Sequence, residues 1–221
     1  MNTALIERPP TVVARKEQPA PVVALKRRTI DSVLIGIGIV VAVVFAVAGG
    51  LLTWGNGFAT DYVGTELTSQ NISFPSAAAL TQEGRTDLLD FAGQRLDTGE
   101  EAEAYAGYID GHLAVIADGA TFADLGTPER AAKAATQAAI DAGKPQAEID
   151  ELQATADGIS GQRNILFKGE TLRGLLLSAY AWSTVGTIAG IAAIGAFIAA
   201  GLMAILVVLG AIHHRRTPKT A

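Results

Sequence analysis

Two long stretches of this sequence carry no charged side chain, and no other feature limits its possible folds as strongly. The first covers residues 32–57 and the second covers residues 174–212. A helix or strand of a soluble protein alternates apolar and polar residues, because one face is buried and the other is wet. Apolar blocks of this length are typical of segments that lie in lipid, so the sequence predicts two transmembrane helices.

The first stretch predicts a transmembrane helix over residues 30–55. Residues 33–52 are twenty consecutive non-polar residues, and a helix of that length spans a hydrocarbon core of about 30 Å. Trp54 follows at the level where amphipathic rings prefer the lipid–water interface. A cleaved signal peptide is the alternative, because Ala46-Val47-Ala48 has the small-x-small form of a cleavage site. The apolar run continues beyond that tripeptide, which favours a retained helix.

The second stretch is longer than one membrane crossing requires. As a helix, its 39 residues extend for roughly 58 Å, nearly twice the thickness of a hydrocarbon core. Two crossings joined by a turn would use nearly every residue and leave no polar loop. We therefore expect one long helix over residues 174–212, with its membrane part at about residues 185–212 and its remainder projecting outside.

The charges on either side of these stretches predict the orientation in the membrane. Residues 1–31 contain six basic and three acidic residues, and residues 213–221 contain three basic residues and no acid. Residues 58–173 contain eight basic and nineteen acidic residues. Lysine and arginine near the ends of a span favour the cytoplasm. We expect a bacterial plasma membrane protein with both termini cytoplasmic, a proline-containing flexible arm over residues 1–29, and a basic tail over residues 213–221.

Small residues at four-residue spacing predict helix-packing faces in both spans. Such faces allow helix backbones to approach closely, which favours association inside lipid. The sequence leaves open whether the partner is the other span or another protein. The predicted packing residues are Gly38, Ala42, Ala46 and Gly50 in the first span, and Gly186, Gly190, Ala192, Ala196, Ala200 and Ala204 in the second.

The region between the spans, residues 58–173, is expected to form an acidic extracytoplasmic helical domain. Aromatic residues make up only 6% of the chain and alanine is abundant, which favours helices over strands. The first helix should continue to about residue 70, where the segment 71–75 breaks it before a proline. Further helices are expected over residues 86–96 and 100–117, from Thr127 as N-cap to Gly143, and from Lys144-Pro145 to about residue 156. Together they should form a small bundle around the outer ends of both long helices, giving an all-α membrane protein.

No group of residues predicts a catalytic site, a metal site or a cofactor site. The chain has no cysteine, which excludes disulfides and thiolate chemistry. Of its three histidines, His213 and His214 lie in the tail and only His112 lies in the outer region, where a structural role is expected. We therefore expect no enzyme activity, no cofactor, no nucleic-acid binding and no identifiable small-molecule substrate.

The segment His112-Leu113-Ala114-Val115, followed by Gly119-Ala120-Thr121-Phe122-Ala123-Asp124-Leu125, resembles a family of actinobacterial two-span membrane proteins. The resemblance covers roughly residues 30–212, including the alanine-, glycine- and valine-rich last span. Members of that family are often labelled aromatic ring-opening dioxygenases. Non-haem iron oxygenases hold iron with two histidines and a carboxylate, and a single outer histidine does not fit that label.

Two functions are consistent with these features. The first is a non-catalytic accessory subunit of a larger bacterial membrane complex, with membrane lipids and other integral membrane proteins as partners. By analogy, actinobacterial respiratory cytochrome supercomplexes carry small subunits of this general build. The alternative is a sensor or ligand-binding ectodomain that signals through a separate partner. A pocket with convergent polar groups would favour the sensor, and an exposed apolar surface outside the membrane would favour the subunit.

Overall fold

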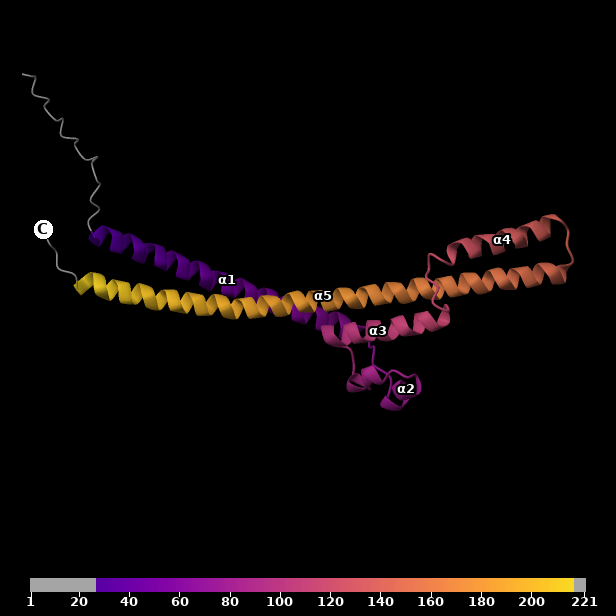
Figure 1. Cartoon of the computed structure of the whole chain (residues 1–221), viewed down its shortest axis with the longest axis horizontal. Helices are drawn as coiled ribbons and strands as arrows, with labels where there is room; N and C mark the ends of the chain where they lie inside the picture. The colour runs from indigo at the N-terminus through magenta and orange to yellow at the C-terminus, as the bar shows by residue number, and fades with distance from the viewer. Residues whose placement is uncertain (1–26, 217–221) are drawn as a thin grey trace, which may run out of the picture.

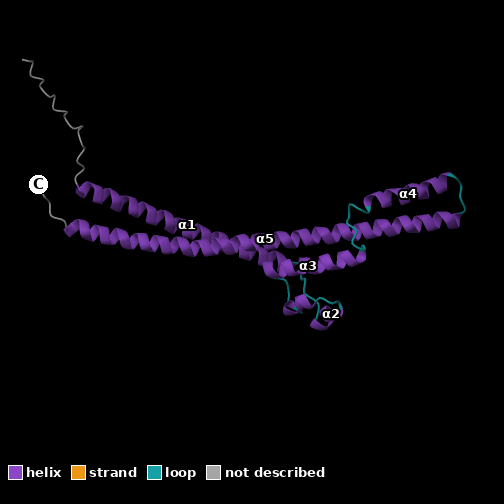
Figure 2. Ribbon diagram, in the orientation of Figure 1, coloured by secondary structure: helices purple, strands orange, loops and turns teal. Residues whose placement is uncertain are grey.

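The computed structural model describes residues 27–216 and is an elongated, all-helical rod (Figures 1 and 2). Residues 1–26 of the expected arm and residues 217–221 of the expected tail lie outside the described part. Residues 27–216 contain no β-strand, only an isolated bridge between Ser73 and Arg95. The elements in chain order are α1 (Arg27–Ser69), α2 (Ala77–Gln82), the 3-10 helix η1 (Thr86–Phe91), α3 (Gly99–Ile116), α4 (Gly126–Asp141) and α5 (Gln146–Arg216).

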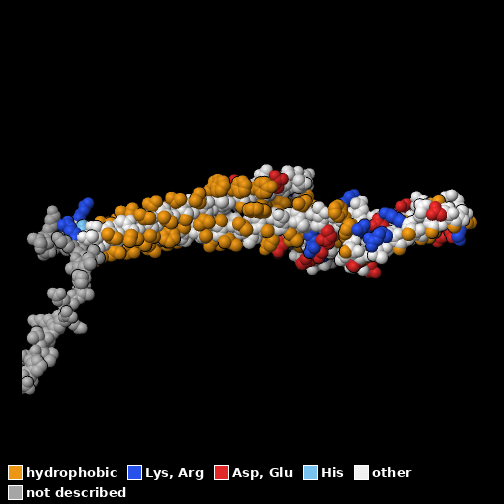
Figure 3. All heavy atoms as spheres, turned by 90° about the horizontal axis from the view of Figure 1, so that it is seen from above, with side chains coloured by type: hydrophobic (Ala, Val, Ile, Leu, Met, Phe, Trp, Pro, Cys, Tyr) orange, Lys and Arg blue, Asp and Glu red, His pale blue; other side chains and the backbone are white. Residues whose placement is uncertain are grey.

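The two longest helices contain the two uncharged stretches. α1 and α5 are the two described helices long and apolar enough to cross a membrane, which agrees with the predicted number of spans. Hydrophobic side chains cover the half of the rod near both termini, and charged side chains gather over the other half (Figure 3). The surface of the rod therefore changes from apolar to polar along its length.

The length of α5 corrects the prediction for residues 144–173. A separate helix from Lys144-Pro145 to about residue 156 was expected, followed by a return segment, but α5 is one helix of 71 residues and about 107 Å. It therefore begins well before residue 174. Pro145 stands just ahead of the helix, where its missing N–H costs nothing. No proline follows within α5, and α3 and α4 both pack along its outer half.

α1 and α5 run antiparallel and pack closely along the apolar half of the rod (Figure 1). Their contacts pair rising residue numbers in α1 with falling numbers in α5: Ile35 with Gly210, Gly38 with Val207, Gly49 with Phe197, Asn56 with Gly190, and Ala59 with Gly186. In α5 the less exposed positions alternate by three and four residues: Gly186, Ala189, Ala193, Ala196, Ala200, Met203, Val207 and Gly210. This spacing is that of a left-handed coiled-coil seam.

The polar half of the rod, away from both termini, is arranged differently from the expected helical bundle. α3 and α4 lie along successive parts of α5 (Figure 1), and two separate hydrophobic clusters replace a single core. The larger cluster joins the end of α1, the segment 72–96, α3 and Leu176, with Leu80 and Leu96 fully buried. The smaller one joins Leu113, Ala117 and Leu166. α4 is rich in alanine and has only Gly126 and Ala139 buried, so it cannot build a thick core.

Several local predictions between residues 70 and 143 can be compared with the structure. The break after α1 is confirmed, and Asn71 adopts a positive φ of 52°. The expected helix over residues 86–96 is only the short η1, and α2 was not predicted. α3 is confirmed within one residue at each end. Its Thr98 side chain and Glu101 form a capping box, and Asp118 and Gly119 follow its end with positive φ.

The expected N-cap of the next helix is wrong. α4 begins at Gly126, with Leu125 in the cap position and no side-chain cap, so Thr127 already lies inside the helix. The turn before it explains the shift, because Asp124 accepts hydrogen bonds from the Thr121 backbone N–H and hydroxyl. Because of that turn, the backbone is already helical when it reaches Thr127. The expected stop is confirmed, since α4 ends at Asp141 and Gly143 has a φ of 62°.

Candidate functional site

The predicted packing residues divide between the α1–α5 seam and the outer surface of the helix pair. Six of them are buried or half-buried at the seam: Gly38, Ala42, Gly186, Gly190, Ala196 and Ala200. The other four are exposed: Ala46, Gly50, Ala192 and Ala204. Four residues advance a helix by about 40° more than one turn, so a row with constant four-residue spacing drifts off the seam. Positions that alternate by three and four residues stay on the seam, so this alternation is the sequence pattern that identifies seam residues.

The glycines at the seam differ from the exposed ones because atoms of the opposite helix lie very close to them. A Cβ at Gly38 would stand 2.6 Å from Val207 Cγ2, and one at Gly186 would stand 2.9 Å from Ala59 Cβ. The prediction missed Gly49, where a Cβ would stand 2.9 Å from the Phe197 ring. Glycine at these places lets the two helices interlock at short range, as in other small-residue packing faces.

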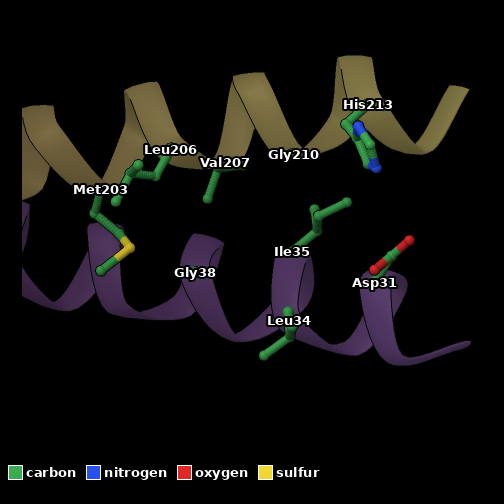
Figure 4. Close-up of a pocket in the computed structure, with 9 residues that line it drawn as sticks. All are labelled: Asp31, Leu34, Ile35, Gly38, Met203, Leu206, Val207, Gly210 and His213. Carbon is green, nitrogen blue, oxygen red and sulfur yellow. The ribbon is translucent and has the colours of Figure 1, made fainter. Parts of the chain in front are cut away.

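A groove that we call the terminal groove lies between the helix ends that carry both termini (Figure 4). Its volume is about 250 Å³. Asp31 of α1 and His213 of α5 stand on opposite sides of its mouth (Figure 4). The rest of its lining is apolar or glycine: Leu34, Ile35, Gly38, Met203, Leu206, Val207 and Gly210.

A second groove, called the side groove here, lies between the outer end of α1 and the middle of α5. Its volume is about 310 Å³. Leu175 and Trp182 on its rim are 65% and 53% exposed. Its lining is mostly apolar with one carboxylate: Tyr62, Val63, Glu66, Leu67, Gln70, Ile72, Leu172, Leu175, Leu176, Ser178, Ala179 and Trp182. Large apolar side chains exposed beside an open groove are typical of a surface that binds a partner.

An aromatic ladder on α1 adjoins the side groove. Trp54 stacks on Phe58 with ring centroids 5.7 Å apart, and Phe58 stacks on Tyr62 at 6.0 Å. All three side chains are more than half exposed. Aromatic rings of this kind are enriched at the boundary of a lipid bilayer, where one end is apolar and the other is wet. The ladder thus marks the change from the apolar to the polar half of α1.

The most connected polar cluster joins α4 to α5. Glu129 accepts hydrogen bonds from Lys133 at 2.7 Å, Ser160 at 2.8 Å and Arg163 at 2.6 Å. These donors lower the pKa of the Glu129 carboxyl to about 2, with Lys133 contributing most. The Arg163 guanidinium also donates to the Phe122 carbonyl oxygen and lies 4.0 Å from the Phe122 ring centroid. The polar groups satisfy one another, so this cluster works as a clamp between helices.

His112 occupies a second structural cluster on α3. Its Nδ1 lies 3.2 Å from the Tyr108 carbonyl oxygen, and its Nε2 lies 3.9 Å from Glu83 Oε2. Arg85 donates to the Gly107 carbonyl oxygen and pairs with Asp87 beside it. These contacts attach the α2–η1 segment to α3. Among residues 27–216, no three histidine, aspartate or glutamate side chains gather in a way that could hold a metal ion.

Compared with known protein families, curated proteins and solved structures, the chain shows no match. The geometry of its own surface is therefore the basis for assigning a function.

Proposed function

We propose that this chain is a non-catalytic accessory subunit of a larger bacterial membrane complex. α1 and α5 anchor it in the plasma membrane with both termini in the cytoplasm, and the polar half of the rod stands outside. The observation that carries the proposal is the side groove, an exposed apolar surface beside the aromatic ladder. In the proposed placement this surface lies beyond the part of the helices that lipid covers. The acidic region between the two basic ends supports this orientation.

The position of the side groove follows from the register of the two helices. Ala59 contacts Gly186, so the antiparallel segment 172–182 of α5 lies farther from the termini than Ala59 does. Tyr62 lies eight residues, or roughly 12 Å, beyond the interfacial Trp54. Headgroups extend only about 5–7 Å beyond each side of the hydrocarbon core. Lipid thus leaves most of the side groove uncovered, and a protein partner is the occupant that shields it.

Charge next to the groove indicates what kind of partner fits. Asp61 and Glu66 form no ion pair with any residue from 27 to 216. The region 58–173 has an excess of eleven negative charges. A partner integral membrane protein with an apolar outer segment flanked by lysine or arginine would be complementary. Such complementarity guides encounter and orientation more than it adds affinity.

The sensor alternative has less structural support. Its expected signature is a pocket with convergent polar groups, and these must be free to bind a ligand. One outer cavity with a partly polar lining contains Glu129, Ser160 and Arg163, and Ser160 and Arg163 both already donate hydrogen bonds to Glu129. The side groove is open and mainly apolar, which suits a protein surface better than a small polar ligand.

The proposal is tested by purifying the full chain from its native membrane in mild detergent and identifying co-purifying proteins by mass spectrometry. Wild type should carry a fixed set of large membrane proteins at constant ratio. Trp182→Ser and Leu175→Ser should lose them, because each places a polar group in the apolar rim. Val115→Ser is the matched control, since Val115 is 83% exposed but is not among the residues that line the groove. Recovery of the wild-type chain alone would contradict the proposal.

A further inference from the structure

A third groove, called the ladder groove here, lies on α1 beside the aromatic ladder. Its volume is about 510 Å³. One side is the aromatic ladder continued by Glu66, and the other side is the row Gly57, Asp61 and Thr65. Residues four apart on a helix form a ridge, and the groove between two such ridges receives a ridge of another helix. The ladder groove therefore has the form of a surface on which another helix packs.

The ladder groove opens on the side of α1 that α5 leaves free. A Cβ at Gly57 would meet no atom within 4 Å, whereas Ala59, two residues later, contacts Gly186 of α5. Trp54 at one end of the ladder is 70% exposed. A helix of another protein can therefore reach this groove without displacing any residue from 27 to 216.

The ladder groove is continuous with the side groove, because Tyr62 and Glu66 line both. The two grooves thus form one surface with two chemical parts. The part toward α5 is mainly apolar, with Leu175 and Trp182 on its rim, and the part on α1 is aromatic and acidic. A single partner can contact both parts.

Charge in the ladder groove indicates which side chain such a partner presents. Asp61 and Glu66 are exposed and form no ion pair with any residue from 27 to 216. Tyr62 stacks on Phe58 with the offset typical of aromatic pairs, so part of its ring face stays open. Carboxylates beside an open aromatic face attract a cation. Arginine suits both, because its planar guanidinium stacks on rings and pairs with carboxylates.

We infer that the ladder groove binds an arginine side chain on a helix of the partner protein. The guanidinium stacks on Tyr62 and pairs with Asp61 or Glu66, while apolar side chains of the same partner occupy the side groove. This inference rests on the proposed function and names the side chain through which the partner is recognised.

A lipid headgroup is a poorer occupant of the ladder groove. In the proposed placement Trp54 lies at the lipid–water interface. Glu66 lies twelve residues, or roughly 18 Å, beyond it along the helix. Headgroups extend only about 5–7 Å beyond the hydrocarbon core, so a lipid cation does not reach the outer carboxylate.

The test measures binding of labelled model helices to the full chain in mild detergent. Each model helix consists of about twenty leucine and alanine residues, and the helices differ only at one position beyond the end, which is arginine, lysine or glutamine. By fluorescence anisotropy, the arginine helix should bind about tenfold more tightly than the glutamine helix, as expected for an exposed cation–π contact together with an ion pair. The lysine helix should lie between them.

Two variants separate the contributions of charge and ring. The double variant Asp61→Asn/Glu66→Gln should lower the ratio of arginine-helix to glutamine-helix binding to near one. Tyr62→Leu should bring the binding of the arginine and lysine helices close together, because the surface on which the guanidinium stacks is gone. Glu103→Gln is the matched control, since Glu103 is an exposed carboxylate outside the groove lining, and it should leave both ratios unchanged. Circular dichroism checks that every variant keeps its helices.

Equal binding of the three model helices by wild type would overturn the inference, and so would an unchanged arginine preference in Asp61→Asn/Glu66→Gln. Displacement of the arginine helix by a choline phospholipid, but not by a glycerol phospholipid with the same acyl chains, would assign the groove to a lipid headgroup and also overturn it. A chain that co-purifies with partner proteins but shows no arginine preference would overturn this site alone. A chain that purifies from its native membrane without partners would overturn the proposed function.

Discussion

At the scale of single residues, a few side chains decide how the outer helices attach to α5. Glu129 is the clearest example, because its side chain is only 12% exposed and joins α4 to Arg163 and Ser160 of α5. Gly99 is another, because it lies where the first residue of α3 touches Ser183 of α5. A substitution at each position is predicted to have a measurable effect.

Removing the Glu129 charge should weaken the attachment of α4. Its carboxyl pKa is lowered from 4.5 to about 2, so the folded state stabilises the ionised form. This contribution is fully present above about pH 4.5 and is lost as the pH falls toward 2. We expect hydrogen exchange in α4 of the wild-type chain to accelerate over that interval, and Glu129→Gln to show fast exchange already at neutral pH.

The control for this prediction is Glu148→Gln, which removes an exposed carboxylate paired only with Lys144 four residues away. Exposed pairs of this kind contribute little to stability. If hydrogen exchange in α4 is as fast in Glu148→Gln as in Glu129→Gln, the contacts of Glu129 with α5 have no special role in holding α4.

Alanine substitutions at two glycines of α3 should change the free energy of unfolding in opposite directions. At Gly99 the added Cβ would stand 2.3 Å from Ser183 Cβ, and such overpacking typically costs about 1–3 kcal/mol. At Gly107 nothing lies within 4 Å, so alanine should stabilise the helix by about 0.8–1 kcal/mol. Chemical denaturation of the full chain in detergent, followed by circular dichroism, measures both. Similar effects at the two sites would refute the packing of Gly99 against α5.

At the scale of elements, α5 is the element to which the others attach. α1, α3 and α4 each pack on a different part of it, and these are the most extensive contacts between helices in the described part of the chain. Its outer half keeps buried positions at Ala156 and Leu166, although Gly158 and Gly161 lie between them. A helix supported on one side by successive partners can tolerate glycines that would weaken it in isolation.

The continuity of α5 predicts the effect of removing two of those glycines. A Cβ at Gly158 or Gly161 meets no atom within 4 Å. Because glycine is about 0.8–1 kcal/mol less favourable than alanine inside a helix, the double variant Gly158→Ala/Gly161→Ala should slow hydrogen exchange across residues 150–170. Faster exchange or loss of stability would indicate a break in the helix at this place, as the sequence alone suggested.

At the scale of the whole molecule, the chain is a rod with an apolar half and a polar half (Figure 3). α5 alone extends for about 107 Å, more than three times the thickness of a hydrocarbon core. If the apolar half lies in the bilayer, the polar half holds the tip of the hairpin formed by α4 and α5 far from the membrane surface. Such a shape suits a subunit that reaches along the outer part of a larger partner.

The orientation of the rod can be measured directly, because the chain has no cysteine. A single cysteine at Val115 (V115C) should react with a membrane-impermeant maleimide added to intact cells. A single cysteine at Arg216 (R216C) should react only after lysis, since the proposed topology places that basic end in the cytoplasm. The reverse labelling pattern would contradict the proposed topology, and labelling of both in intact cells would contradict two-span insertion.

How much the sequence predicted can be judged from particular elements. The two apolar helices, the break at residues 71–75 and the limits of α3 all follow from local signals, namely uninterrupted apolar residues, a proline, and a helically spaced apolar stripe that ends at Asp118-Gly119. The start of α4 and the union of residues 146–173 with the last helix were missed. Thr127-Pro128-Glu129 is a good local start signal, but the turn held by Thr121 and Asp124 begins the helix earlier.

The predicted packing residues were also only partly correct. Their small size identified both helices as packing elements, but only some of them, such as Gly38 and Gly186, meet the partner helix, while Ala46 and Gly50 face outward. The terminal groove and the side groove were not predicted. Each is formed by residues more than a hundred positions apart in the chain, and no local pattern reports such a pairing.

The sequence by itself determined which two helices are apolar enough to cross a membrane, because a long charge-free stretch of helix is typical of lipid surroundings. Only the tertiary structure decided which faces remain open, because that depends on the register of α1 against α5. A shift of one residue in that register would rotate different side chains into the seam and close or move both grooves. The two grooves are therefore properties of the assembled helix pair.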